Sequence, residues 1–178
     1  MMPMREVVEL LTLFEQNKIE VWIDGGWGVD ALLGHQTREH DDLDIALSHN
    51  DVPKLRALLE ARNYKDVARP DTRDCNFVMG DDQDQRVDIH SFIFDEHGKN
   101  IFGIAYPIES LTGTGVIAGH PVKCVPVDWL VKFHTGYPVD ENDYRDVLAL
   151  CERFGIALPD EYKEFTTRTQ RHKEKDRP

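Results

Sequence analysis

Residues 40–45 have the sequence His40-Asp41-Asp42-Leu43-Asp44-Ile45, and residues 24–27 before them have the sequence Asp24-Gly25-Gly26-Trp27. Successive side chains of a β-strand point to opposite faces, so Leu43 and Ile45 can enter the core while Asp42 and Asp44 share the other face. Two such carboxylates roughly 6 to 7 Å apart repel each other by roughly 2 to 3 kcal/mol. A Mg²⁺ ion bound between them turns this repulsion into a net attraction. The pattern therefore predicts a metal site at Asp42 and Asp44. A surface strand that merely alternates apolar and acidic residues is the alternative.

The glycine pair comes between an expected strand at 20–24 and an expected helix at 27–33. Glycine permits a tight turn, and the backbone N–H groups at the start of a helix bind phosphate. Gly25 and Gly26 are thus predicted to seat the phosphates of a nucleoside triphosphate. Arg38 and His40 could add side-chain donors, and the alternative for both is a solvated loop.

A third carboxylate stands in the segment Arg86-Val87-Asp88-Ile89-His90. Alternation places Val87 and Ile89 in the core and Asp88 on the opposite face, together with Arg86 and His90. On a strand next to Asp42 and Asp44, Asp88 could take a proton from an acceptor hydroxyl or ligate a second ion. Alternatively, Asp88 pairs only with Arg86. His90 could contact the acceptor, orient Asp88 or be structural.

Several motifs of the chain resemble those of the small antibiotic nucleotidyltransferases, which modify lincosamides and aminoglycosides and belong to the DNA polymerase β-like superfamily. These motifs are Gly25-Gly26-Trp27, the stretch from Trp27 to Leu33, His40-Asp41-Asp42-Leu43-Asp44, Phe133-His134-Thr135-Gly136-Tyr137 and Tyr144-Arg145-Asp146-Val147. The similarity covers most of the chain. It specifies the superfamily well and the acceptor poorly.

The resemblance implies a metal-dependent adenylyltransferase that confers antibiotic resistance. Such an enzyme transfers a nucleoside monophosphate, AMP from Mg-ATP, to a hydroxyl of a lincosamide or aminoglycoside, with one or two Mg²⁺ ions. Asp42 and Asp44 would hold the metal, and the resemblance favours Asp88 as the general base. It also suggests that His134 and Tyr137 border the nucleotide or the acceptor, with packing as the alternative for both.

Composition limits the partners and the compartment. The net charge of −12 disfavours nucleic acid, whose binding depends on clustered lysine and arginine. No apolar run approaches the ~20 residues that a membrane span needs, and no signal peptide is visible, so we expect a cytoplasmic protein. Its three cysteines, Cys75, Cys124 and Cys151, are widely spaced and are expected to be reduced core thiols. Monomer and homodimer both remain open.

The expected fold class is α/β (α+β): a nucleotidyltransferase fold with a mixed β-sheet flanked by helices and a short helical C-terminal part. We expect a core at 1–126 and a helical segment at 127–178 that closes the cleft. Periodicity predicts helices at 4–16, 51–62, 127–134 and 141–154, strands at 42–47, 76–79 and 86–92, a hairpin turn at 80–84 and a short β region at 116–125. Residues 167–178 are polar and basic and are expected to fray.

A function of a different class is also open. Minimal nucleotidyltransferase-like chains can act as partner-binding modules of the antitoxin type, without small-molecule turnover. Such chains are usually shorter than 178 residues and lack a C-terminal helical segment.

Overall fold

The computed structural model describes residues 1–165, so the expected fraying of 167–178 lies outside the described residues. The chain divides into two compact units, Met1–Pro126 and Val127–Pro178.

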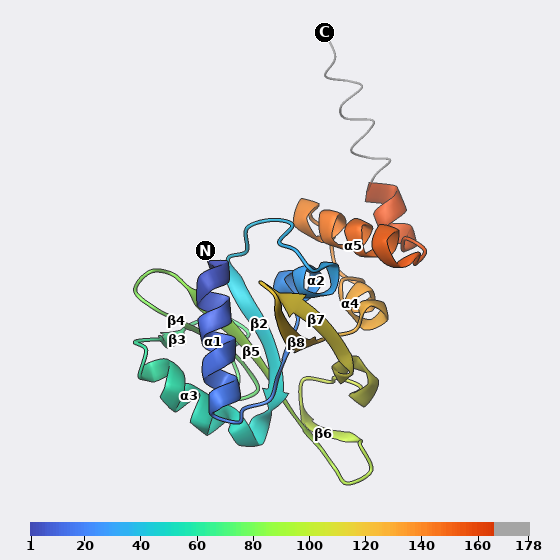
Figure 1. The fold of residues 1–178 in the computed structure, drawn as a ribbon. Coiled ribbons are helices and arrows are strands. Elements are labelled where there is room, and N and C mark those ends of the chain that lie inside the picture. Colours follow the sequence, from blue (N-terminus) through green and yellow to red (C-terminus); the bar gives the residue numbers. More distant parts are fainter. Residues whose placement is uncertain (166–178) are drawn as a thin grey trace. The chain divides into compact units, whose positions relative to one another are not determined.

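A mixed sheet forms the centre of the first unit (Figure 1). Within the described residues it has eight strands, seven of them in the order β3-β4-β5-β2-β1-β8-β7, while β6 pairs with β5. Strands β2 and β5 run parallel, and β1 pairs antiparallel with β2 and parallel with β8. The strands are β1 (Val21–Ile23), β2 (Asp42–Ser48), β3 (Lys65–Val67), β4 (Asn76–Gly80), β5 (Arg86–Phe94), β6 (Asn100–Gly103), β7 (Gly113–Ile117) and β8 (His120–Cys124).

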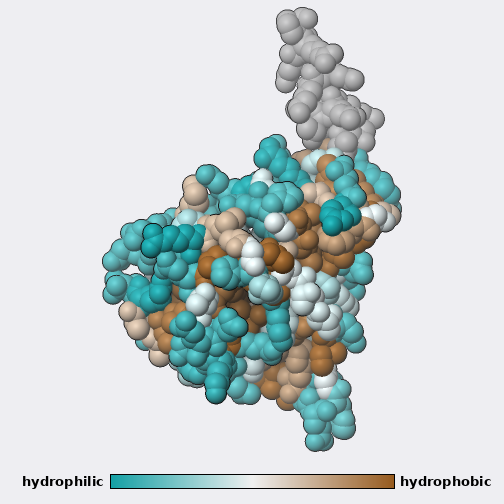
Figure 2. Space-filling model, in the orientation of Figure 1, coloured by the Kyte–Doolittle hydropathy of each residue, from teal (hydrophilic) through white to brown (hydrophobic). Residues whose placement is uncertain are grey.

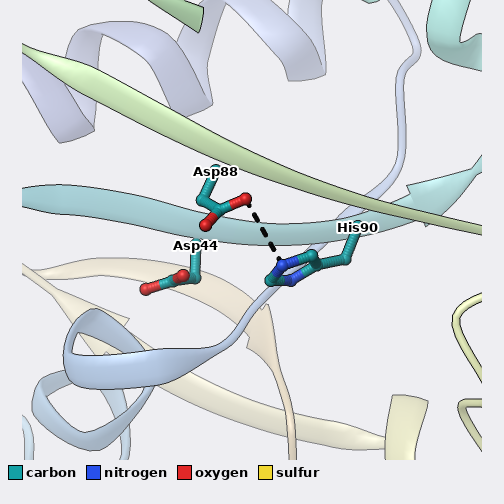
Figure 3. Close-up of side chains that lie close together, drawn as sticks. All are labelled: Asp44, Asp88 and His90. Carbon is teal, nitrogen blue, oxygen red and sulfur yellow. Dashed lines mark ion pairs between the residues drawn. The ribbon is translucent and has the colours of Figure 1, made fainter. Parts of the chain in front are cut away.

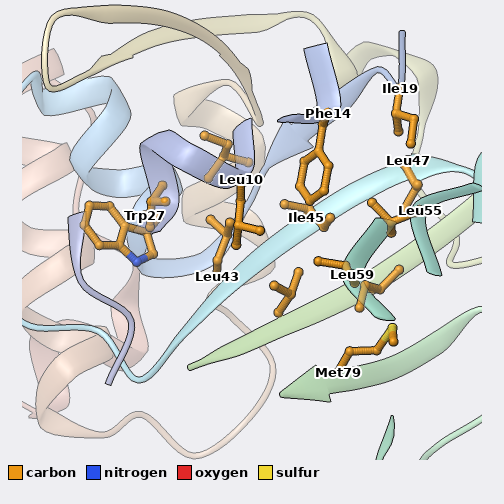
Figure 4. Close-up of a cluster of buried hydrophobic side chains, with 14 of the residues drawn as sticks. Leu10, Phe14, Ile19, Trp27, Leu43, Ile45, Leu47, Leu55, Leu59 and Met79 are labelled. Carbon is orange, nitrogen blue, oxygen red and sulfur yellow. The ribbon is translucent and has the colours of Figure 1, made fainter. Parts of the chain in front are cut away.

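Helices α1 (Met4–Gln16) and α3 (Val52–Glu60) contribute to the apolar core. Helix α1 buries Val7, Leu10 and Phe14, which recur at helical spacing. Figure 4 shows Leu10 and Phe14 packed toward Leu43 and Ile45 of β2, with side chains of α3 beside them. This packing fixes the register of β2, because its apolar side chains are used on one face and its aspartates are left on the other.

Several expected boundaries are wrong by a few residues. Strand β5 ends at Phe94 rather than at 92, and the β region expected at 116–125 begins at Gly113. Helix α2 (Gly25–Leu33) begins at Gly25 rather than at 27, because the side chain of Asp24 accepts a hydrogen bond from Gly25 N and caps the helix. Helix α3 begins after a 3₁₀ turn (His49–Asp51) and ends at Glu60, not at 62. The short strands β3 and β6 were not predicted, since three or four residues carry too little alternation.

The second unit contains α4 (Val127–Phe133), α5 (Glu141–Phe154) and a further helical stretch at 160–165. Asp140 and Asp143 form a capping box at the start of α5, and Gly155 ends that helix with φ of 69°. Helix α5 buries Val147, Leu150 and Cys151. Phe154, the last residue of α5, is exposed.

The cysteines agree with the expectation from the sequence, and hydrophilic side chains cover much of the face shown in Figure 2. The cysteines Cys75, Cys124 and Cys151 are all free and buried, as predicted. Among residues 1–165, no helix is both long enough and apolar enough to cross a membrane.

Candidate active site

Three aspartates converge on the face of the sheet opposite the core formed with α1 and α3. In the parallel pairing of β2 with β5, Asp44 is the partner of Asp88, and Asp42 is the partner of Arg86. Leu43, Ile45, Val87 and Ile89 are fully buried, as alternation predicts. One ligand atom from each of Asp44, Asp88 and His90 lies within 4.8 Å of the others, and Figure 3 shows these three side chains facing one another.

The carboxylates impose an electrostatic cost on one another. Burial raises the pKa of Asp44 well above its usual range, and the charges of Asp42, Asp88 and Asp24 add to this. Burial also raises the pKa of Asp42, followed in size by the charges of Asp88 and Asp41. A hard divalent cation is the group that would relieve this repulsion, and carboxylate oxygens are its preferred ligands. The donor set therefore fits the magnesium site expected at Asp42 and Asp44.

The glycine turn lies directly against the metal-site strand. Gly25 has φ of 56°, and a Cβ placed on it would come within 2.2 Å of Asp44 Oδ2. The backbone N–H of Asp24 also donates to the carbonyl of Asp44 at 3.0 Å. A phosphate held by this turn would thus sit next to a cation bound by Asp44.

Arg38 and His40 lie beside Gly26, as their expected role requires. A Cβ at Gly26 would fall 2.3 Å from His40 Nδ1 and 2.8 Å from Arg38 Nη2. His40 is only 3% exposed, so a solvated loop is the wrong description for it. Arg38 is partly exposed and donates to the carbonyl of Glu39 at 3.1 Å.

Asp30 holds His40 in place. Its carboxylate accepts a hydrogen bond from His40 Nε2 at 2.5 Å and two more from the backbone N and Oγ1 of Thr37, at 2.9 and 2.6 Å. Among the described residues, no hydrogen-bond partner is found for the buried His40 Nδ1. Asp30 therefore fixes the loop that leads into the metal-site strand.

Asp88 pairs with Arg69 rather than with Arg86. Arg69 Nη1 and Nη2 donate to the two oxygens of Asp88 at 2.7 and 3.1 Å, and His90 Nε2 lies 3.3 Å from Asp88 Oδ1. The alternative that Arg86 is the partner of Asp88 is wrong, because the Arg86 guanidinium binds Asp84 instead. The sequence gives no signal for Arg69, which lies in the irregular loop between β3 and β4.

Asp24 and Tyr106 form a second contact that sequence reasoning missed. The hydroxyl of Tyr106 donates to Asp24 Oδ2 at 2.7 Å and lies 3.5 Å from His90 Nδ1. Tyr106 is 4% exposed, and burial, followed by the charge of Asp24, raises its pKa well above the usual range. Tyr106 thus links the glycine turn to the strand that carries Asp88. Asp24 directly precedes the Gly25–Gly26 motif of the sequence. Tyr106 lies in a loop, where no residue pattern predicts its contact with Asp24.

His134 and Tyr137 belong to the second unit. His134 is buried, its Nδ1 donates to the carbonyl of Leu130 at 2.8 Å, and its own carbonyl accepts from the Tyr162 hydroxyl. Tyr137 is 44% exposed, and its hydroxyl donates to Asp143 Oδ1 at 3.1 Å. These contacts give both residues packing roles within their own unit, and their contact with an acceptor stays a prediction.

The chain is similar to known antibiotic nucleotidyltransferases. Residues 6–150 match a family model described as aminoglycoside-2''-adenylyltransferase. A lincosamide resistance protein from Staphylococcus haemolyticus is 31% identical over 150 residues, which cover 80% of this chain and 91% of the relative. A 2''-aminoglycoside nucleotidyltransferase from Escherichia coli is 26% identical over 146 residues, which cover 72% of this chain and 80% of that relative.

A solved structure agrees with these sequence relationships. The crystal structure of the lincosamide antibiotic adenylyltransferase LnuA, bound to lincomycin, superimposes with a TM-score of 0.74 at 26% identity. The match covers 88% of this chain and 99% of that one. The expected mixed-sheet nucleotidyltransferase fold is confirmed.

Proposed function

Because the chain belongs to the aminoglycoside-2''-adenylyltransferase family, we propose that it transfers AMP from Mg-ATP to a hydroxyl of a small antibiotic and so inactivates the drug. The observation that carries this proposal is the convergence of Asp42, Asp44 and Asp88 beside the Gly25–Gly26 turn. The acceptor is a lincosamide or an aminoglycoside, the two drug classes named for the relatives.

Asp42 and Asp44 hold the divalent cation. When bound, Mg²⁺ neutralises charge on the triphosphate and on the pyrophosphate that leaves. Burial, followed by the charges of the neighbouring carboxylates, raises the pKa of both aspartates, and a divalent cation would offset this cost more fully than Arg69 does.

The triphosphate is seated by Gly25 and Gly26. The absence of side chains there lets the Asp44 carboxylate approach Gly25, and lets Arg38 and His40 approach Gly26 as cationic or polar donors. Asp30 positions His40.

Asp88 serves as the general base. The acceptor hydroxyl transfers its proton to a carboxylate oxygen of Asp88 while the hydroxyl oxygen forms a bond to the α-phosphorus. The bond from that phosphorus to the bridging oxygen breaks, and its electron pair leaves with pyrophosphate. His90, 3.3 Å from Asp88, orients this carboxylate or borders the acceptor.

A pyrophosphate-release screen tests the proposal. The purified chain is incubated with Mg-ATP and a panel of lincosamides and aminoglycosides, and release that depends on the drug is the expected result. Release with neither class, in Mg²⁺ or in Mn²⁺, would contradict the proposal and favour the partner-binding module instead.

The salt dependence of the same reaction separates the two acceptor classes. A net charge of −12 attracts a polycationic aminoglycoside over long range, whereas a lincosamide carries at most one positive charge. For an aminoglycoside, kcat/KM should fall clearly between low and physiological ionic strength, because salt screens this attraction. For a lincosamide it should change little.

A further inference from the structure

Arg69 engages both oxygens of the proposed general base. Its guanidinium forms a two-point contact with Asp88, with N–O distances of 2.7 and 3.1 Å. The Asp88 side chain is only 8% exposed, so water does not weaken this ion pair greatly. The pair lies on the same face as Asp44 and His90, whose ligand atoms are grouped with those of Asp88.

The loop between β3 and β4 presents Arg69 in a defined conformation. The backbone N–H of Arg69 donates to Thr72 Oγ1 at 3.1 Å, and the backbone N–H of Thr72 donates back to the carbonyl of Arg69 at 3.2 Å. Asp71 lies 3.5 Å from Arg69 Nε, and its carboxylate accepts from Asn76 Nδ2 at 3.0 Å. The guanidinium is therefore held near Asp88 by the loop as well as by the carboxylate.

We propose that Arg69 is a positioning residue that competes with the divalent cation for Asp88. The inference rests on the proposed function. Arg69 takes one lone pair on each Asp88 oxygen, and His90 Nε2 lies 3.3 Å from Asp88 Oδ1. A cation that shares a site among Asp44, Asp88 and His90 therefore competes with these donors for the same two oxygens. Release of one of these oxygens by Arg69 would favour both metal binding and proton acceptance by Asp88, because the oxygen would lose a competing positive charge.

The competition has a measurable consequence for metal affinity. When a binding-competent state is only partly populated, the apparent dissociation constant rises by the inverse of that population. If Arg69 engages Asp88 in about nine molecules of ten, its removal tightens metal binding about tenfold. Removal of the positive charge of Arg69 also tightens metal binding, because the guanidinium repels a nearby cation.

The test is a titration of the nucleotide-free protein with Mn²⁺, with free Mn²⁺ followed by electron paramagnetic resonance. Arg69→Gln is expected to bind Mn²⁺ about tenfold more tightly than the wild type. Arg69→Lys keeps the charge but loses the two-point contact, so its affinity should lie between the two. Circular dichroism establishes that each variant is folded, and Arg69→Lys carries the test if Arg69→Gln does not fold.

Arg86→Gln is the matched control. Arg86 stands on the same face of β5, opposite Asp42, but its guanidinium binds Asp84 and not Asp88. Both substitutions remove one positive charge near the metal site, and only Arg69→Gln removes the contact with Asp88. Arg86→Gln is therefore expected to change Mn²⁺ affinity by less than about twofold to threefold.

Unchanged or weaker Mn²⁺ binding in the folded Arg69 variants would overturn the inference. An equal gain in Arg86→Gln would overturn it too, because the effect would then arise from the general field of the site. Failure of the proposed function has a different signature: none of the proteins would bind Mn²⁺, with or without ATP.

Discussion

Asp44 and Asp88 are direct partners across the parallel strands β2 and β5, and a turn without side chains at Gly25 lies against the Asp44 carboxylate. This pairing brings the proposed metal ligand and the proposed base onto one face. It also makes the metal-free site electrostatically unfavourable, which leads to the first prediction.

Asp44→Asn should stabilise the protein when metal is removed with a chelator. The raised pKa of Asp44 means that its protonated form is favoured in the folded state. Below about pH 4, Asp44 is protonated in both the folded and the unfolded state and does not lower the free energy of unfolding. As the pH rises through the folded-state pKa, Asp44 must ionise inside the protein, and the free energy of unfolding falls. At pH 7 the amide variant should gain about 1 kcal/mol or more in free energy of unfolding, and the gain should shrink toward pH 4.

Urea denaturation across this pH range measures the effect. Asp82→Asn is the control, because Asp82 is exposed and its change should stay within about 0.5 kcal/mol. A lower stability of Asp44→Asn than of the wild type at pH 7, with chelator present, would contradict the electrostatic description of the site.

Asp88→Asn should separate binding from chemistry. The amide has the shape of the carboxylate but no charge. Mg-ATP should still bind through Asp42, Asp44 and the glycine turn, at an affinity lowered by the loss of one ligand charge, while turnover falls by about 10²- to 10⁴-fold through loss of the base. Calorimetry of Mg-ATP binding and single-turnover kinetics measure the two effects. A variant that retains more than about a tenth of wild-type turnover would remove Asp88 from this role.

Gly26→Ala should weaken nucleotide binding. The new Cβ would lie 2.3 Å from His40 Nδ1, so the turn or His40 must shift. Loss of one hydrogen bond to a charged phosphate costs about 1.5 to 3 kcal/mol, or about tenfold or more in affinity. Gly80→Ala is the control, because its nearest contact is the flexible end of Val67 at 3.1 Å, away from the turn. Equal Mg-ATP affinities for the two variants would argue against a phosphate seat at Gly26.

Tyr106→Phe should impair the site beyond its effect on stability. The substitution removes only the hydroxyl that holds Asp24, and a hydrogen bond to a charged group contributes about 1.5 to 3 kcal/mol. Tyr64→Phe is a matched control, because the buried Tyr64 hydroxyl donates to Glu6 at 3.1 Å. Both variants should lose stability in thermal unfolding, but only Tyr106→Phe should show a raised KM for Mg-ATP. A raised KM in both, or in neither, would refute the positioning role of Tyr106.

The sequence predicted those parts of the site that follow from local periodicity. Asp42 and Asp44 share a face because Leu43 and Ile45 are buried, and the same alternation placed Asp88 correctly. The partners of these aspartates could not be predicted in the same way. Arg69 and Tyr106 reach the site from irregular loops, where no pattern relates position in the chain to position in space.

His40 illustrates a different limit. The sequence placed it near the phosphates, but its burial and its hydrogen bond to Asp30 depend on how α2 packs against the loop that follows. Boundaries such as the start of α2 at Gly25 likewise depend on a capping contact that periodicity does not contain.

Mass spectrometry of the antibiotic after incubation with the protein and Mg-ATP tests the central claim most directly. With the wild-type protein, a lincosamide or an aminoglycoside is expected to gain the mass of one adenylyl group. Asp42→Asn and Asp44→Asn, although folded, are expected to leave the drug unmodified. An unmodified drug with the wild-type protein, or an adenylylated drug with either variant at the wild-type rate, would contradict this claim.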